Sequence, residues 1–334
     1  MSGAPSLVIR CDAGARHGLG HLSRCLGIAS HAALTGFLVR FVCQVSTDIS
    51  LRIRAAGFAL TAVDMATGRE DPDEWLNESA DILLVDSKEM NGDYIRRLSD
   101  SAPVICFDDE EARDLPCRAV INNNIWVHPS DYRQNDEREL WLGPKYNTIS
   151  PAYFAMDGRE RDGLLISMGG EDPHDHTSWL LRTLKDQLGN LHVHVCIGPA
   201  HPAPEQAMAT CRALLPSAVV YRAPTSLIEP ISHCALALTA GGTTCYELAA
   251  AGVSMAIIAV EDHQTTMRDT LVTRGAALSL GSHLDYDADR ARLVLAQLRD
   301  ATCAMGLARA ANKLFNSSGI AQIVHEMQRL VRHN

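Results

Sequence analysis

The sequence predicts an α/β fold of two Rossmann-like domains whose parallel sheets face a central cleft. Its 334 residues are about twice the length of an ordinary single-core domain. Short apolar runs alternate with helix-like segments in both halves, which is the pattern of βαβ units. A polar stretch at 122–161, rich in Asn, Pro and Asp, separates the halves. We therefore expect a first domain at 1–150, a second at 151–334 and a ligand site in the cleft between them.

Five apolar runs in the first half have the length and composition of buried parallel strands. They lie at residues 7–11, 37–43, 82–85, 104–107 and 119–121. The segments between them have helical spacing, and the first helix-like stretch begins at Leu22. Parallel neighbours need crossover connections of this kind, so the runs are expected to form one parallel sheet.

The second half repeats the pattern of the first. Its predicted strands lie at residues 164–168, 193–197, 218–221, 235–238 and 255–260. Its predicted helices lie at residues 178–188, 205–215, 244–251 and 265–274. A last segment, 287–331, also has helical spacing, and it is a candidate to pack back across both domains.

The composition excludes several classes of protein. Hydrophobic residues make up 46% of the chain and charged residues 21%, which is typical of a globular protein. A net charge of -10 argues against non-specific nucleic-acid binding. The ten cysteines form no C-x-x-C pair and no zinc-type cluster with histidine, so we expect buried thiols in a reducing compartment. Since no run approaches ~18 apolar residues, we expect a cytoplasmic protein without stable membrane insertion.

The segment Gly18-Leu19-Gly20-His21 lies between the first predicted strand and the first predicted helix. Ligands bind at such turns because glycine lets the backbone approach them and the helix presents unpaired N–H groups. A histidine there can take or give a proton near neutral pH. His21 is therefore a candidate catalytic base, and the alternative is a histidine that only caps or packs the helix.

Three carboxylates that follow predicted strands of the first domain are candidates for the site. Asp12 follows the first strand, and it either orients His21 or caps the turn. Asp108 and Asp109 follow the fourth strand and are candidates for a general acid and general base pair. Adjacent residues on a strand point to opposite faces, so at most one of these two is expected to face a substrate.

A glycine turn in the second domain, Gly169-Gly170, follows the strand at 164–168 and leads through Asp172 into a helix. Such a turn can present N–H groups to a phosphate. His174 and His176 come next, and their spacing also occurs in metal sites. We interpret these two histidines as surface polar residues near the nucleotide.

A second glycine turn, Gly241-Gly242-Thr243-Thr244, follows the strand at 235–238 and opens the helix that carries Glu247. Backbone N–H groups and two hydroxyls would form a diphosphate cradle there, and Glu247 could bind ribose hydroxyls. The alternatives are a tight packing turn and an exposed carboxylate at a helix start. Neither glycine turn matches the P-loop or a full G-x-G-x-x-G, so ATP hydrolysis and NAD chemistry are disfavoured.

Taken together, these motifs resemble the GT-B-like UDP-sugar hydrolases of pseudaminic acid biosynthesis, distant relatives of the glycosyltransferase that makes peptidoglycan lipid II. The resemblance spans nearly the whole chain. Its first-half motifs are Arg10-Cys11-Asp12, Gly18-Leu19-Gly20-His21, Arg24-Cys25-Leu26, Phe107-Asp108-Asp109-Glu110, Cys117, Asn122-Asn123-Asn124 and Gly143-Pro144-Lys145-Tyr146. Its second-half motifs are Met168-Gly169-Gly170-Glu171-Asp172-Pro173, Gly241-Gly242-Thr243-Thr244-Cys245-Tyr246-Glu247 and Gln264.

The resemblance implies an enzyme that cleaves a UDP-linked amino sugar at its anomeric carbon with water, giving UDP and the free sugar. In that scheme His21 activates the water with Asp12 beside it, and the uridine diphosphate sits on the glycine turns of the second domain. No metal and no cofactor are expected. The implied substrate-binding residues are Gly18, Gly20, Arg24, Lys88, Asp108, Tyr146, Gly169, Gly170, Asp172, Gly241, Gly242, Thr243, Thr244, Glu247, His263 and Gln264.

The chain departs from this family at two places. Where the hydrolases have Asp-His-Tyr after the third strand, this chain has Asp86-Ser87-Lys88, which replaces a phenol with a positive charge. Lys88 could bind a carboxylate or phosphate of an unusual substrate, or it could face solvent. His263 stands beside Gln264 where the family tends to have asparagine.

Three functions remain open from the sequence. In the first, the hydrolase, His21 activates water. In the second, a GT-B glycosyltransferase, the same histidine deprotonates an acceptor hydroxyl. The third is a nucleotide-sugar-binding protein without turnover, against which the joint presence of Asp12, His21 and Glu247 argues. The acidic charge, without an apolar and basic cluster, favours hydrolysis. The partner expected in each case is a small-molecule UDP-sugar, and the sugar, the base specificity and the oligomeric state are left open.

Overall fold

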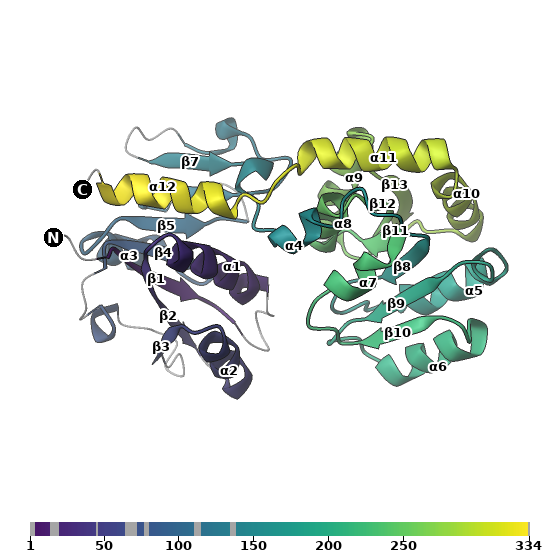
Figure 1. The fold of residues 1–334 in the computed structure, drawn as a ribbon, viewed down its shortest axis with the longest axis horizontal. Coiled ribbons are helices and arrows are strands. Elements are labelled where there is room, and N and C mark those ends of the chain that lie inside the picture. Colours follow the sequence, from purple (N-terminus) through teal and green to yellow (C-terminus); the bar gives the residue numbers. More distant parts are fainter. Residues whose placement is uncertain are drawn as a thin grey trace. The chain divides into compact units, whose positions relative to one another are not determined.

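The computed structural model describes residues 4–13, 20–44, 46–63, 72–76, 80–109, 115–133 and 138–332. The chain forms two compact units (Figure 1). The first unit comprises residues 1–148 together with 318–334, and the second comprises 149–317. Each unit is built on one parallel sheet, as the sequence predicts.

The first unit has a seven-stranded sheet in the order β3-β2-β1-β4-β5-β6-β7, with every pair parallel. Its strands are β1 (Ser6–Cys11), β2 (Leu38–Gln44), β3 (Ala59–Val63), β4 (Ile82–Asp86), β5 (Val104–Phe107), β6 (Ala119–Asn122) and β7 (Glu139–Leu142). The order reverses between β1 and β4, so their carboxyl ends form the switch point at which α/β sheets bind ligands.

Helices cover both faces of this sheet, since alternate strand residues are buried on opposite sides. Leu7 and Ile9 belong to the core that includes α1 (Gly20–Leu34) and α12 (Ile320–Arg332). Val8 belongs to the core on the other face, with α3 (Gly92–Ser99). The remaining elements of the unit are α2 (Thr47–Ala55), η1 (Pro72–Glu74), η2 (Pro129–Asp131) and η3 (Pro144–Tyr146).

The second unit has a six-stranded parallel sheet in the order β10-β9-β8-β11-β12-β13. Its strands are β8 (Gly163–Ser167), β9 (Val193–Ile197), β10 (Val219–Arg222), β11 (Cys234–Ala240), β12 (Ser254–Ala259) and β13 (Leu278–Ser282). Its helices are α4 (Pro151–Phe154), α5 (His176–Leu188), α6 (Pro204–Leu214), α7 (Ile228–Ser232), α8 (Thr244–Ala250), η4 (Asp262–Gln264), α9 (Thr265–Thr273), α10 (Ala288–Leu298) and α11 (Ala301–Leu314). The switch point of this sheet lies between β8 and β11.

Three strands and one domain assignment differ from the prediction. Strands β3, β7 and β13 are not among the predicted runs, and each lies at an edge of its sheet. β7 lies inside the stretch at 122–161 that the sequence suggests is a linker. Helix α12 belongs to the first unit, although its residues were assigned to the second domain. Its apolar stripe, Ile320, Ile323 and Met327, is buried in the core of the first unit against α1.

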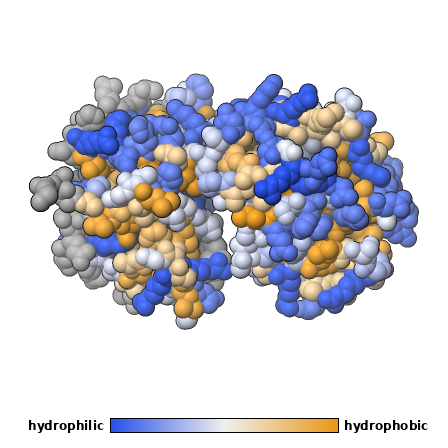
Figure 2. All heavy atoms as spheres, in the orientation of Figure 1, coloured by the Kyte–Doolittle hydropathy of each residue, from blue (hydrophilic) through white to orange (hydrophobic). Residues whose placement is uncertain are grey.

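Hydrophilic residues cover much of both units on the face drawn in Figure 2, with hydrophobic residues among them. Among the residues that the structure describes, the most exposed large apolar side chains are Leu34, at 86%, and Leu284, at 80%, on different units. Within the described ranges, no helix is both long and apolar enough to cross a membrane.

Candidate functional site

His21 is fixed at the start of α1 by a carboxylate from the neighbouring strand. Its Nδ1 lies 2.6 Å from Oδ1 of Asp86, the last residue of β4. β4 pairs with β1 at the switch point, where Asp86 is in register with Cys11. The backbone carbonyl of Asp86 accepts a hydrogen bond from the Asp12 N–H. Gly18 lies outside the described residues, and Gly20 is the first residue of α1. The sheet therefore determines where the histidine is held.

Asp86 is buried, with 1% of its side chain exposed, and it is held in its charged form by Arg24. Arg24 Nε donates to Asp86 Oδ2 at 2.6 Å, and Arg24 Nη2 donates to Oδ1 at 2.5 Å. Burial by itself raises the pKa of Asp86, but the Arg24 charge and the hydrogen bonds from Arg24 and His21 bring that pKa below its ordinary value. Asp86 is thus an ionised carboxylate that can accept a hydrogen bond from an N–H at Nδ1 of His21.

Arg24 also holds a second carboxylate. Its Nη1 and Nη2 donate to the two oxygens of Asp109 at 3.0 and 2.8 Å, and its guanidinium lies over the Phe107 ring at 4.1 Å from the centroid. Burial lowers the pKa of Arg24, but its two carboxylate partners raise it above the ordinary value. We refer to His21, Arg24, Asp86 and Asp109 as the Asp86 cluster.

Two carboxylates predicted for the site have other surroundings. Asp12 accepts a 2.9 Å hydrogen bond from Nη1 of Arg10, a fully buried arginine, so Asp86 and not Asp12 holds His21. Asp108 is fully buried, whereas Asp109 is 30% exposed and joins the cluster. The two adjacent side chains thus have different surroundings, as expected, and Asp109 is the one that joins the cluster, not the Asp108 that the resemblance implies.

The other predicted residues of the first unit lie apart from the described contacts of the cluster. Lys88 is exposed two residues beyond Asp86. Tyr146 is 4% exposed and stacks on Trp141, with 6.0 Å between ring centroids, in the core that includes α12. Burial raises the pKa of Tyr146 above its ordinary value. This residue of the predicted site is therefore a packing residue, because the 3-10 turn η3 directs it under the last helix.

The first glycine turn of the second unit is closed by its own carboxylate. Gly169 has a φ of +82°, which favours glycine, and Asp172 follows it in the loop before α5, whose N-cap residue is Asp175. Asp172 Oδ1 accepts the His176 N–H at 2.8 Å, and Oδ2 accepts the Thr177 N–H at 2.9 Å. Burial raises the pKa of Asp172, but these hydrogen bonds lower it overall. The Asp172 carboxylate therefore already satisfies the first two N–H groups of α5, which a phosphate would otherwise contact.

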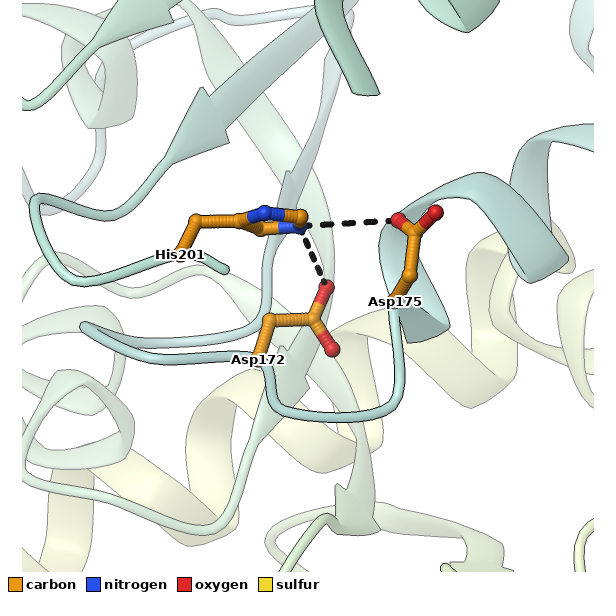
Figure 3. Close-up of side chains that lie close together, drawn as sticks. All are labelled: Asp172, Asp175 and His201. Carbon is orange, nitrogen blue, oxygen red and sulfur yellow. Dashed lines mark ion pairs between the residues drawn. The ribbon is translucent and has the colours of Figure 1, made fainter. Parts of the chain in front are cut away.

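Asp175 and His201 complete this closed turn (Figure 3). The Nε2 of His201 lies 3.7 Å from Asp172 Oδ2 and 3.5 Å from Asp175 Oδ1. Its Nδ1 accepts the Ala203 N–H at 3.1 Å, so the neutral ring carries its proton on Nε2. The buried Nε2 has no hydrogen-bond partner among the described residues, so it does not bridge the two carboxylates by hydrogen bonds. The three side chains have the ligand types of a metal site, but a metal at Nε2 would need a lone pair there, and the ring would then carry its proton on Nδ1 in place of the Ala203 hydrogen bond.

The two histidines after this turn differ from each other in exposure. His174 is exposed, but His176 is only 1% exposed and packs edge-on against Tyr286 at 4.9 Å between centroids. The prediction that both lie at the surface is therefore wrong for His176. Its ring is drawn inward because it is the first residue of α5 and packs against the segment that precedes α10.

The second glycine turn is open. Gly241 donates to Gln264 Oε1 at 3.0 Å and to the Ile258 carbonyl at 3.2 Å, and Gln264 Oε1 also accepts the Val260 N–H at 3.2 Å. A Cβ on Gly241 would lie 2.7 Å from the Gln264 carbonyl, whereas a Cβ on Gly242 would meet nothing within 4 Å. Among the described residues, the N–H groups of Gly242, Thr243 and Thr244 have no hydrogen-bond acceptor. The turn therefore offers three donors beside open space.

Glu247 lies one turn into α8, where it is partly buried and hydrogen-bonded to Tyr153 of α4. Burial raises the pKa of Glu247 to about 7, and the Tyr153 hydrogen bond opposes that shift. Burial and the Glu247 charge raise the pKa of Tyr153. His263 is exposed and pairs with Glu261, with Nδ1 3.0 Å from Oε2. The structure thus brings Gly241–Thr244 and Gln264 together, and it leaves His263 at the surface.

Comparisons with known proteins establish the fold. No protein-family model matches the chain, and no curated protein matches it. Among solved structures, it is similar to MurG of Acinetobacter baumannii, with 16% identity over 97% of this chain and 100% of that one, at a TM-score of 0.67. The chain has the GT-B fold. It is also similar to the spinosyn forosaminyltransferase SpnP, with 15% identity over 99% of this chain and 100% of that one, at a TM-score of 0.68. Phytolacca americana UGT2 shares 12% identity over 98% of this chain and 100% of its own, at a TM-score of 0.70.

Sequence reasoning missed three residues that the structure places in these groups: Asp86, Tyr153 and His201. Asp86 could have been found, because in a Rossmann order the strand that it ends lies next to the first strand. Asp109 was one of two candidates. No signal in the sequence connects Tyr153 with Glu247 or His201 with Asp172, since both pairs form only through tertiary packing.

Proposed function

We propose that the chain is a nucleotide-sugar-dependent enzyme that transfers a sugar to an oxygen nucleophile, with His21 as the general base. The observation that carries this proposal is the histidine at the switch point of a GT-B domain, fixed through Nδ1 by a buried, ionised aspartate. Such a histidine has Nε2 available to accept a proton from an attacking hydroxyl. The two units then contribute different chemistry, the base from the first and the nucleotide site from the second.

The open turn at Gly241–Thr244 supports binding of the diphosphate by the second unit. Its N–H groups, unpaired among the described residues, can donate hydrogen bonds to the oxygens of a diphosphate without a cluster of basic side chains, which suits a chain of net charge -10. Solved structures similar to this chain include the rhamnosyltransferase SpnG complexed with thymidine diphosphate and UGT2 complexed with UDP-2fluoro-glucose. We infer that the ligand here is a nucleoside diphosphate sugar, with the leaving diphosphate stabilised at this turn.

The fold comparisons favour a glycosyltransferase, since the similar structures include enzymes of that name. A hydrolase is the second candidate. The motif resemblance favours the hydrolase, because the chain has the motifs of the UDP-sugar hydrolases in the same order. These are Gly20-His21, Met168-Gly169-Gly170 and Gly241-Gly242-Thr243-Thr244. The same base would serve both reactions, with an acceptor hydroxyl in the first and water in the second.

An assay of UDP release separates the two candidates. UDP-N-acetylglucosamine and UDP-linked diacetamido-trideoxy sugars would be incubated with the chain, and the sugar product would be followed by NMR. Release of free sugar without an acceptor indicates a hydrolase. Release only when sugar or lipid-linked acceptors are added indicates a transferase. Turnover in the His21→Ala variant at the wild-type rate would overturn the assignment of the base, and unaltered UDP affinity in that variant is the expected control.

A further inference from the structure

Two aspartates and a histidine from two loops of the second unit converge on one place (Figure 3). Asp172 and Asp175 lie in the loop between β8 and α5, and His201 lies in the loop between β9 and α6. The side chains of His201 and Asp172 are 1% and 2% exposed, and that of Asp175 is 30% exposed. One possible ligand atom from each lies within 4.8 Å of the other two. We refer to these three residues as the His201 cluster.

The carboxylates of the His201 cluster are not balanced by any described lysine or arginine. Their described ion-pair partners are histidines alone. Asp86 of the first unit is similarly buried, but Arg24 donates to both of its oxygens. Buried charges in proteins are as a rule paired with an opposite charge or bound to a metal. Two neighbouring carboxylates without a basic partner therefore favour the binding of a cation.

The Nε2 atom of His201 points at both carboxylates, yet it is buried and has no hydrogen-bond partner among the described residues. It lies 3.7 Å from Asp172 Oδ2 and 3.5 Å from Asp175 Oδ1, which is too far for a good hydrogen bond. Two ligand atoms of a tetrahedral zinc ion, each about 2.1 Å from the metal, lie about 3.4 Å apart. The two separations are thus close to the edges of a zinc-centred tetrahedron.

Backbone N–H groups at the start of α5 hold both carboxylates. Asp172 Oδ2 accepts the Thr177 N–H at 2.9 Å, and Asp175 Oδ1 accepts the Ser178 N–H at 3.1 Å. A carboxylate oxygen has two lone pairs, so each of these oxygens keeps one for a metal. Hydrogen bonds of this kind orient the ligands of metal sites.

We propose that the His201 cluster binds one Zn²⁺ ion through His201 Nε2, Asp172 Oδ2 and Asp175 Oδ1, with water as the fourth ligand. The imidazole favours a transition metal over Mg²⁺ and Ca²⁺, which prefer oxygen ligands. The ion joins the loop after β8 to the loop after β9, which is a structural role. This site departs from the expectation of a chain without metal, and it does not depend on the proposed function.

Zinc binding moves one proton within the His201 ring. The bond from zinc to Nε2 forms as Nε2 loses its proton and Nδ1 gains one, so the ring stays neutral. Nδ1 then no longer accepts the Ala203 N–H, and water can accept that N–H because Ala203 is partly exposed. One neutral hydrogen bond is thus exchanged for coordination by three side chains, which favours the metal.

The first test measures zinc binding by the full chain, with ZnCl₂ as the probe and a chelator of known affinity as competitor. The wild type is expected to bind one Zn²⁺ ion at the cluster. Asp175→Asn and His201→Ala should bind it more than about 100-fold more weakly, since loss of a residue that only supports a ligand costs about 10- to 100-fold. Asp175→Asn keeps an acceptor for the Ser178 N–H. His192→Ala is the matched control, because His192 and Asp162 form an exposed pair 3.1 Å apart.

The second test replaces zinc with Co²⁺ and records the visible absorption of the full chain. A tetrahedral site gives intense d–d bands, and a site without cysteine gives no thiolate-to-cobalt band. The wild type and His192→Ala should show the d–d bands alone, and Asp175→Asn and His201→Ala should lose them. This readout distinguishes the cluster from sites at the ten cysteines, whose thiolates also bind zinc.

Loss of affinity in both cluster variants, with none in His192→Ala, supports the site. Wild-type affinity in either cluster variant would overturn the three-ligand site, as would a wild type that binds no stoichiometric zinc or gives a thiolate band. Where His201→Ala does not fold, Asp175→Asn decides the question. The assignment of His21 is tested by UDP release and not by metal binding, so failure of the zinc site and failure of the proposed function are distinguishable.

Discussion

The two glycine turns of the second unit look alike in sequence but differ in structure. Both follow central strands of the same sheet, and both lead into a helix. At the Gly169-Gly170 turn, the Asp172 carboxylate accepts the first helix N–H groups. At the Gly241-Gly242 turn, the neutral side chain of Gln264 accepts the Gly241 N–H, and the next N–H groups have no acceptor among the described residues. An internal carboxylate therefore satisfies the helix N–H groups at one turn, and no described acceptor does so at the other.

The largest effect is expected from opening the closed turn. Asp172→Ala leaves two buried N–H groups without acceptors, and it places alanine at a φ of +43°. We expect a loss of roughly 3 kcal/mol in the free energy of unfolding, measured by urea denaturation. Asparagine tolerates the same backbone conformation and keeps one acceptor oxygen, so Asp172→Asn should lose less stability than Asp172→Ala. Equal losses in both variants would assign the effect to the lost carboxylate and not to backbone strain, since asparagine tolerates this φ.

The next effect is expected from filling the open turn. Gly242→Val places a side chain in space where nothing lies within 4 Å, so it should fold normally and block the approach of a diphosphate. We expect the Kd for UDP, measured by calorimetry, to rise about 100-fold through the loss of two charge-assisted hydrogen bonds. Gly170→Val is the matched control, since its Cβ also meets nothing. Equal weakening by both variants would contradict the contrast between the turns.

Removal of the support behind the open turn should have a smaller effect. Gln264→Leu deprives Gly241 and Val260 of a shared acceptor, although Gly241 keeps its bond to the Ile258 carbonyl. We expect a loss of about 1 kcal/mol in stability and a UDP affinity lowered a few-fold. His263→Ala, next to it but exposed, is the control that should change neither quantity. A wild-type affinity in Gln264→Leu would show that the turn does not need this support.

The smallest effect concerns the pH dependence at Glu247. The folded pKa of about 7 lies above the ordinary value, so folding retains a proton that the unfolded chain releases. The stability contributed by Glu247 is therefore fully present below about pH 4.5 and is lost as the pH rises toward 7. Relative to Glu247→Gln, the wild type should lose roughly 2 °C in Tm between pH 5 and pH 7.5. A constant difference between the two proteins would contradict the raised pKa.

The sequence determined the fold class, because the period of the apolar runs and the polar connections are local properties. The ten predicted strands all occur, and the GT-B fold is confirmed. The three missed strands lie at sheet edges, where one side is not paired and the apolar pattern is weaker. The sequence also located His21 and both glycine turns, since each combines a strand end with a helix start.

The tertiary structure alone decided which side chains meet. The carboxylate that holds His21 comes from a residue 65 positions away, through the register of β1 and β4, and not from the nearby Asp12. Tyr146 is a packing residue because the distant helix α12 returns to cover it. The hydrogen bonding of each glycine turn depends on a single side chain, Asp172 or Gln264, and on where the backbone places that side chain. Hydrogen bonds between groups far apart in the chain depend on that geometry, and the order of residues does not specify it.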